Sequence, residues 1–438
     1  MSILSQFKQS QNADFPNVRP SLDLRFALAK KLDPRITFTR GTSGTYFGPD
    51  GIMRTAAINE PRFDHDPITG ECKGLLMEEL KANLLSYSED FTDSSWPKFG
   101  GSISPNIITS PNGTTTASKF IVNTSTTTHY PQKVIGSTTV GSSYTFSVFV
   151  KAAETSIIVL VCGSGSWYRA ATFNLKTGVA TSNAQDVGVS AATTYTITPY
   201  PNGWYRCSVT SSTSDGSSCT NQIRVSNGTK TNGLSGDGVS GFYLWGAQLE
   251  ETAFPTSYFP TDSTAGGKTR SKDNAMMTGT QFSSWYNQKE GTFFTDVKSS
   301  TSFNANNASP FGVISSGNQI VISNYHTTLS VWLFRNSVST TVGFFNSSMP
   351  VSSNRKSAAT YRTGPPDYYT AASGGGNIKD STTNPLSTQT KTGTLRTDHS
   401  YFEISPIRQG LVSFNGTIKR ITYYPIQLTT QQLVNLTS

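Results

Sequence analysis

The chain has 438 residues, which at roughly 150 residues per domain is enough for about three domains. Aromatic residues make up 11% of the chain, too many for a disordered linker. The formal net charge of +8 favours anionic partners, but no dense run of Lys and Arg with interleaved aromatic residues occurs, so nucleic-acid binding is not expected. No apolar stretch reaches the length of a membrane span, so membrane insertion is not expected either.

The four cysteines, Cys72, Cys162, Cys207 and Cys219, form no CxxC motif, and the four histidines are scattered. A zinc site is therefore not expected. Free buried thiols are the simplest interpretation and fit assembly in a reducing cytoplasm. A Cys207–Cys219 bridge across a hairpin is the alternative. The first residues contain no signal-peptide core.

Residues 1–85 are predicted to form a small N-terminal segment. Residues 1–20 are polar and form either a flexible tail or an extended arm that docks on other chains. Alternation of apolar residues at 22–26 and 36–38 predicts two strands. The segment contains too few apolar residues for a core of its own, so we expect it to pack on neighbours, either the next domain or other protomers.

A hairpin is predicted within this segment. The turn at residues 66–70 would place residues 62–64 opposite residues 75–77. Residues 77–85 are predicted as a short helix, with Leu80 and Leu84 on one side.

Residues 86–262 are predicted to form a first β-sandwich. Residues 241–250 read as a strand that is apolar on both faces, which is typical of the middle of a packed sheet. Pro255 and Pro260 then end the pairing, because proline cannot donate a backbone hydrogen bond. Several short strands with turn residues between them favour a sandwich. The other strands are expected near residues 144–150, 157–161, 168–173, 195–198, 204–209 and 223–225.

Residues 263–274 are predicted to be a linker, because apolar residues almost vanish there and Lys268, Arg270 and Lys272 would keep it solvated. Residues 275–438 are predicted to form a second sandwich. Its strands are expected near residues 291–297, 311–314, 319–323, 330–334, 342–345, 357–361, 402–404 and 416–424. A short helix at 428–436 would be capped by Thr429 or Thr430. Residues 362–400 are expected to form a long loop rich in Gly, Ser and Thr.

Several of these stretches resemble a known family. The runs at residues 33–40 and 61–79, and the run from Tyr243 to Thr261, resemble bacteriophage virion fibre and spike proteins that carry a carbohydrate-binding-like jelly roll. Together they cover most of residues 20–262. From about residue 290 the chain is more loosely similar to the concanavalin-A-like (laminin G-like) sandwiches of phage fibres.

The resemblance implies a virion appendage. It would be assembled in the host cytoplasm and exposed on the surface of the particle, at either its head or its tail. Residues 1–85 would dock on other virion proteins, and the chain would form a homotrimer. The family does not indicate which host-surface glycan is bound.

Sugar binding requires exposed aromatic rings beside planar polar groups. The candidate residues are Tyr368 and Tyr369 in the long loop, and Trp167 and Tyr168 after the turn at 163–166. The pairs Trp204-Tyr205, Trp285-Tyr286 and Tyr325-His326 are further candidates. Trp204 and Trp245 are instead expected in the core, where large rings usually lie.

The residues favour two other kinds of chemistry less. Asp64, His65, Asp66 and Glu71 could form a metal clip, but Ca²⁺ prefers six or more oxygens, and Asp66 followed by proline more simply begins a turn. A glycan hydrolase needs two carboxylates in a groove, whereas acidic residues are sparse beyond residue 100. No metal, cofactor or catalytic residue is therefore expected.

The sequence therefore predicts an all-β chain with a docking segment followed by two jelly-roll sandwiches. Its predicted function is non-catalytic adhesion to host-surface glycan, strengthened by multivalency. The alternative is a purely structural or decoration protein of the virion without a ligand. A glycan hydrolase is the third hypothesis.

Overall fold

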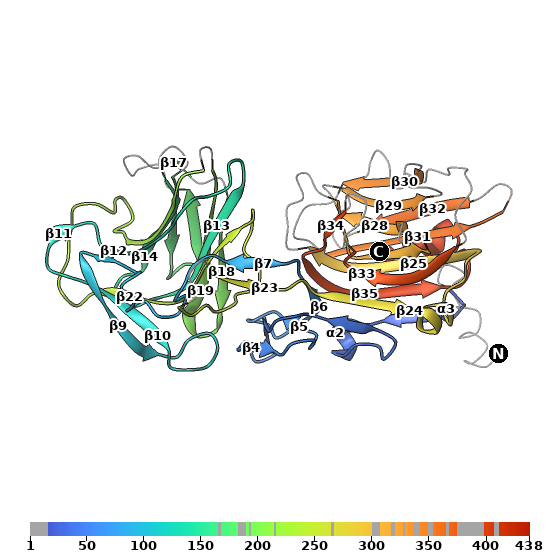
Figure 1. Cartoon of the computed structure of the whole chain (residues 1–438), viewed down its shortest axis with the longest axis horizontal. Helices are drawn as coiled ribbons and strands as arrows, with labels where there is room; N and C mark the ends of the chain where they lie inside the picture. The colour runs from blue at the N-terminus through green and yellow to red at the C-terminus, as the bar shows by residue number, and fades with distance from the viewer. Residues whose placement is uncertain are drawn as a thin grey trace, which may run out of the picture.

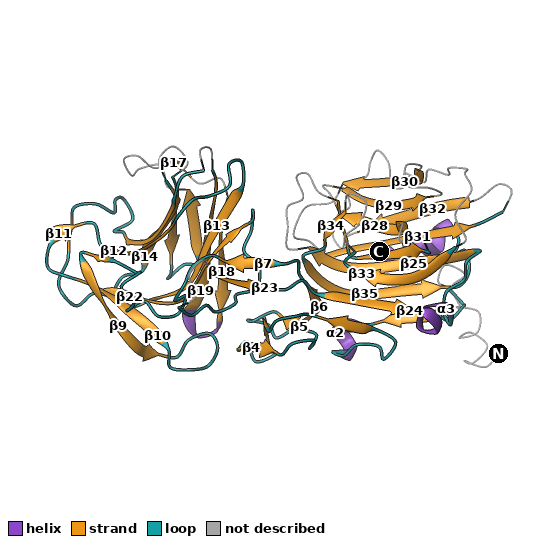
Figure 2. Cartoon of the chain, in the orientation of Figure 1, coloured by secondary structure: helices purple, strands orange, loops and turns teal. Residues whose placement is uncertain are grey.

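The structure is a computed structural model. It describes residues 16–164, 168–182, 190–191, 194–213, 216–263, 267–299, 307–316, 320–326, 329–335, 341–348, 354–364, 368–374, 398–406 and 411–438. Strands dominate these residues, which confirms the all-β prediction, and Figures 1 and 2 show them in two lobes side by side. The α-helices within them are α2 (Phe26–Ala29), α3 (Gly279–Ser283) and α4 (Thr430–Thr437). No helix in this part of the chain is long and apolar enough to cross a membrane.

The jelly-roll lobe packs two antiparallel sheets face to face. One sheet has the order β18-β19-β13-β22-β10-β9, and the other has the order β16-β15-β14-β20-β12-β8, with β17 beside β15. A large apolar core fills the space between the two sheets. The strands of this lobe are β8 (Lys98–Phe99), β9 (Gly101–Ile108), β10 (Ala117–Val122), β11 (Thr126–Thr127), β12 (Tyr130–Ile135), β13 (Ser143–Ala152), β14 (Ile157–Gly163), β15 (Arg169–Asn174), β16 (Val179–Ser182), β17 (Ser190–Ala191), β18 (Thr194–Tyr200), β19 (Trp204–Ser212), β20 (Cys219–Val225), β21 (Leu234–Ser235) and β22 (Gly241–Glu251).

Strand β22 is buried on both faces, as predicted, and lies in the interior of its sheet. Phe242 and Leu244 point into the core between the sheets, whereas Trp245 belongs to a second cluster on the opposite face. Gly246 then interrupts the alternation. Its φ of +62° suits glycine, and the register against β13 shifts beside it, as at a β-bulge. The bulge returns Leu249 to the face that Phe242 and Leu244 occupy.

The N-terminal segment, in its described part, is integrated into the C-terminal lobe; the sequence predicted that it packs on a neighbour, but not that this neighbour is the C-terminal sandwich. Strand β1 (Leu22–Leu24) and strand β6 (Cys72–Met77) both pair with β35 (Gly416–Tyr424). Strand β2 (Thr37–Thr39) pairs with β24 (Asn274–Thr278) in the lobe's other large sheet. The apolar side chains of β1, α2 and β6 share one core with Phe293 and Tyr423, because these short strands are too poor in apolar residues to form their own core.

The predicted hairpin within this segment is confirmed, since β5 (Phe63–His65) pairs antiparallel with β6, but the register is one residue from the expected one, with Phe63 opposite Leu75 and Asp64 opposite Gly74. The other strands of the C-terminal lobe are β25 (Glu290–Ser299), β26 (Asn307–Ser309), β27 (Phe311–Ser315), β28 (Ile320–His326), β29 (Leu329–Arg335), β30 (Thr341–Ser348), β31 (Asn354–Arg362), β32 (Tyr368–Gly374), β33 (His399–Ile404) and β34 (Leu411–Ser413). Figure 1 shows the N-terminal strands, in blue, lying along this orange and red lobe.

The chain leaves the C-terminal lobe through β7 (Lys81–Asn83) and returns to it through β23 (Lys268–Arg270). These two strands pair antiparallel, so the jelly-roll lobe is an insertion between them. The prediction of a short helix at 77–85 is wrong, because strand β7 lies within that stretch. The predicted linker at 263–274 is likewise corrected in its described part, since Arg270 is 1% exposed and Asp273 is fully buried.

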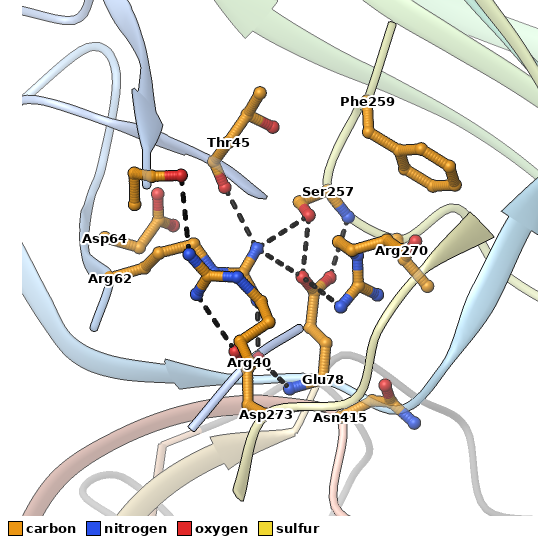
Figure 3. A network of polar contacts seen from close by, with 12 residues as sticks. Arg40, Thr45, Arg62, Asp64, Glu78, Ser257, Phe259, Arg270, Asp273 and Asn415 are labelled. Atoms are coloured by element: carbon orange, nitrogen blue, oxygen red, sulfur yellow. Dashed lines mark hydrogen bonds and ion pairs between the residues drawn. The ribbon is translucent and has the colours of Figure 1, made fainter. Parts of the chain in front are cut away.

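A buried network of charged side chains lies beside β7 and β23, where the chain passes between the two lobes (Figure 3). Arg62 lies between two carboxylates, with its Nη1 2.7 Å from Glu78 Oε2 and its Nη2 2.5 Å from Asp273 Oδ2. Arg40 contacts Asp273 at 3.2 Å, and Arg270 contacts Glu78 at 3.5 Å. Three arginines thus share two carboxylates, and all five side chains are buried.

The network shifts the pKa values of its members. Burial by itself raises the pKa of Glu78. Arg270 and Arg62 lower it by a larger amount, so that the pKa falls to about 2. Burial lowers the pKa of Arg62, but Asp273 and Glu78 more than reverse this and raise it. Ser257 of the jelly-roll lobe donates to Glu78 from both its backbone nitrogen (2.7 Å) and its hydroxyl (2.6 Å). The network therefore ties the jelly-roll lobe to the N-terminal strands.

The hairpin of β3 (Gly44–Phe47) and β4 (Met53–Ala56) adds an apolar contact between the lobes. Met53 packs with Phe149, Trp204 and Trp245 on the outer face of the first jelly-roll sheet, and its backbone nitrogen donates to Pro111 at 2.9 Å. The Phe47 ring lies 4.7 Å from the ring of Tyr200. This outer face of the jelly roll is therefore covered by the N-terminal segment.

Two smaller predictions are also settled. All four cysteines are free and buried, so the free-thiol interpretation is confirmed and the Cys207–Cys219 bridge is not formed. Helix α4 begins after Thr429, whose hydroxyl accepts a hydrogen bond from the backbone of Gln432 in a capping box, as the sequence indicated.

Candidate functional site

The outer face of the second jelly-roll sheet carries a row of side chains that crosses six strands. Strand pairing places Phe99 of β8 opposite Tyr130 of β12, and the Arg224 guanidinium of β20 lies 5.7 Å from the Tyr130 ring centre. Beyond Arg224 the register continues through Val159 of β14, Thr172 of β15 and Thr181 of β16. We call the six residues Phe99, Tyr130, Arg224, Val159, Thr172 and Thr181 the cross-strand row.

The row follows from alternation in the strands. In β20, Ile223 and Val225 point into the core between the sheets, so Gln222 and Arg224 point outward. In β14, Val159 and Val161 point outward and form a small cluster with Ala170. Among the described residues, the partly buried ring of Tyr168 packs on this cluster.

Hydrogen bonds hold the polar side chains of this face in one arrangement. The Tyr168 hydroxyl donates to Gln222 Oε1 at 2.8 Å and accepts from Arg224 Nη2 at 3.0 Å. Arg224 Nε donates to the same Gln222 oxygen at 2.6 Å, and Gln222 Nε2 donates to Gln132 Oε1 at 2.5 Å. The amides, phenol and guanidinium are therefore positioned without a ligand, which reduces the entropy lost on binding.

An aromatic stack lies next to this array. The rings of Phe99 and Tyr130 are 4.8 Å apart and inclined by 22°, and Phe99 is 42% exposed. A ring held flat by a neighbour offers a rigid apolar surface at low entropic cost. Gln222 is only 5% exposed, so it orients Tyr168, Arg224 and Gln132 from below. Together, the stack and these three side chains can bind a ligand that has both apolar faces and hydroxyl groups.

Of the residues proposed from the sequence, Tyr168 belongs to this face. Trp167 lies outside the described residues. Tyr368 and Tyr369 were expected in a loop, and this prediction is wrong. Both lie in strand β32, where they pair with Arg362 and Tyr361. Their side chains lie outside the described part of the structure.

Three rings of the other candidate pairs, Trp204, Trp285 and Tyr286, are buried and not available to a sugar. Trp204 is 2% exposed and Trp285 is 3% exposed, and Tyr286 lies beside Trp285 with its hydroxyl 2.6 Å from His399 Nδ1. Trp204 and Trp245 are core residues, as the sequence predicted.

Five residues of this face were missed from the sequence: Phe99, Tyr130, Gln132, Gln222 and Arg224. The alternation of Gln222 and Arg224 with Ile223 and Val225 was a usable signal, because it predicts a strand with one polar outer face. Nothing in the sequence indicates that β12 and β20 are neighbours, so the sequence does not bring their outward residues together.

The carboxyl groups with raised pKa values in the jelly-roll lobe are structural. Burial raises the pKa of Glu250, which is fully buried and accepts hydrogen bonds from the backbone of Thr256 (2.9 Å) and from Gln248 (2.8 Å). Burial also raises the pKa of Glu89, which accepts from the Tyr258 hydroxyl at 3.0 Å.

The metal clip considered at residues 64–71 is a turn. Asp66 accepts hydrogen bonds from the backbone of Ile68 (3.0 Å) and Thr69 (2.9 Å), and Asp64 accepts from the backbone of Phe47 (2.8 Å). In the part of the chain that the structure describes, no group of three or more His, Cys, Asp or Glu side chains is placed to hold a metal ion.

The chain was compared with known proteins. No family model matches it, and no curated protein matches it. Among solved structures, it is similar to the Ruminococcus gnavus IT-sialidase CBM40, with 17% identity and a TM-score of 0.27 over 35% of this chain and 84% of that chain. A likeness at this level carries no argument about function.

Proposed function

We propose that this chain is a non-catalytic glycan-binding protein of a bacteriophage virion appendage, and that the face around the cross-strand row contacts the glycan. The observation that carries the proposal is the exposed Phe99 ring, stacked on Tyr130 beside the fixed array of Gln132, Gln222, Arg224 and Tyr168. The apolar face of a sugar packs on aromatic rings, while its hydroxyls pair with amide, phenol and guanidinium groups.

The virion role rests on the resemblance of residues 20–262 to phage fibre and spike proteins. Docking on other virion proteins is proposed for the segment before β7. That segment buries most of its apolar side chains in the C-terminal lobe but leaves Leu28, Ile58, Ile68 and Leu80 more than half exposed. Homotrimer formation and exposure on the particle surface complete the proposal, with symmetry repeating a weak site to give avidity.

Replacing Phe99 with alanine is expected to weaken glycan binding about tenfold, because one aromatic contact contributes up to about 1.5 kcal/mol. Tyr168→Phe is expected to weaken it as well, because the hydroxyl that orients Gln222 and Arg224 is lost. The measurement is binding of the full-length protein to a glycan array that includes surface polysaccharides extracted from bacteria.

The matched control is Ile107→Ala, which removes a side chain of similar exposure, 45%, from the edge strand β9 of the other sheet. It should bind like the wild type. Unchanged binding by Phe99→Ala would move the site elsewhere. A wild-type protein that binds no glycan would favour the structural or decoration alternative.

A further inference from the structure

The length of the cross-strand row suggests which part of a glycan it binds. Six strands make five spacings of about 4.8 Å, so the row spans about 24 Å. A single sugar ring would cover only a fraction of this length. Val159 within the row is fully buried, so the contacts come from Phe99, Tyr130 and Arg224 on one side of it and from Thr172 and Thr181 on the other. Contacts spread over this length have room for several consecutive sugar units.

Both ends of the row lie at the sides of the sheet. Strands β8 and β16 are the outermost strands in the described order of this sheet, and they carry Phe99 and Thr181. Both side chains are exposed. Because the row ends at the edges of the sheet, no further strand of the described order lies beyond either end. A glycan lying along the row can therefore continue past both sides.

The chemistry changes along the row, which favours contacts with several units. One end presents the ring stack of Phe99 and Tyr130. The middle presents Arg224, with the Tyr168 hydroxyl bound to it at 3.0 Å. The other end presents the hydroxyls of Thr172 and Thr181 on paired strands. The row thus offers one apolar contact and two polar contacts on different strands. They are spread along the sheet rather than gathered in one pocket.

We propose that the row binds an internal stretch of an extended polysaccharide laid across the strands, and not a single terminal sugar. This inference rests on the proposed function, because it specifies the ligand of the same face. Affinity then rises as sugar units are added until the oligosaccharide spans the row, and longer chains gain nothing further within one site.

The test uses the full-length protein and ladders of one to eight sugar units, prepared from neutral glucans, mannans, chitin and hydrolysed bacterial surface polysaccharide. Isothermal titration calorimetry measures the affinity at each length. The expected result is a rise of at least tenfold between one unit and the longest oligosaccharides, followed by a plateau.

Variants at the two ends sharpen the test. Phe99→Ala and Thr181→Val each should weaken binding of the longest oligosaccharides several-fold and change binding of the shortest less, whereas Ile107→Ala should change neither. A single sugar that binds as tightly as the longest oligosaccharide would overturn the inference but leave the proposed function standing. Failure of every ladder and every polysaccharide to bind would overturn both.

Discussion

Replacing Arg62 with alanine should lower the free energy of unfolding by about 3–5 kcal/mol, because it leaves buried carboxylates without their main partner. Arg62 contacts both Glu78 and Asp273, and its side chain is fully buried. Arg40 and Arg270 remain, but each contacts only one of the two carboxylates and at a longer distance. Urea denaturation followed by circular dichroism measures the change.

The control for this variant is Arg54→Ala. Arg54 also pairs with a carboxylate, Asp50, at 2.8 Å, but both side chains are more than two-fifths exposed. Exposed pairs of this kind contribute at most about 1 kcal/mol. Equal losses of stability in the two variants would show that the buried network does not hold the lobes together.

The second large effect is expected from Gly74→Val in β6. The φ of Gly74 is +100°, and a Cβ there would collide with the backbone carbonyl of Ile418 in β35. Backbone strain and overpacking each cost about 1–3 kcal/mol, so the expected loss is about 2–6 kcal/mol. Hydrogen exchange should show lost protection in residues 416–424, because β6 is their neighbour in the sheet.

Gly136→Ala is the matched control. Apart from its two neighbours in the chain, no residue has an atom within 4 Å of the position that the alanine methyl group would occupy, and Gly136 does not have a left-handed backbone. This substitution should leave stability and exchange unchanged. If Gly74→Val loosened only the N-terminal segment and left residues 416–424 protected, the segment would not be an integral part of the C-terminal lobe.

Local features of this fold could be predicted from the sequence because they depend on neighbouring residues. The hairpin of β5 and β6 follows from its turn, strand β22 follows from its apolar run, and helix α4 follows from its cap at Thr429. Alternation shows which face of a strand is apolar, but it does not show which strand lies beside it. The pairing of β1 and β6 with β35, across more than 300 residues, was therefore out of reach.

The misread linker has a similar cause. Arg270 and Asp273 resemble solvated charges in the sequence, because their partners Glu78 and Arg62 lie about 200 residues earlier. The same limit applied to the candidate site. Tyr168 was proposed because a Gly/Ser turn precedes it, whereas Gln222 and Arg224 become a candidate site only beside Tyr130 and Tyr168.

Hydrogen–deuterium exchange of the full-length protein, with and without a bacterial surface polysaccharide that it binds, tests the central claim most directly. Added polysaccharide is expected to slow exchange in β12, β20 and β15, which carry residues of the cross-strand row, and to leave β9 and β10 on the opposite sheet unchanged. Slowed exchange confined to the C-terminal lobe, with β12 and β20 unaffected, would contradict this claim and place the glycan site in the second sandwich.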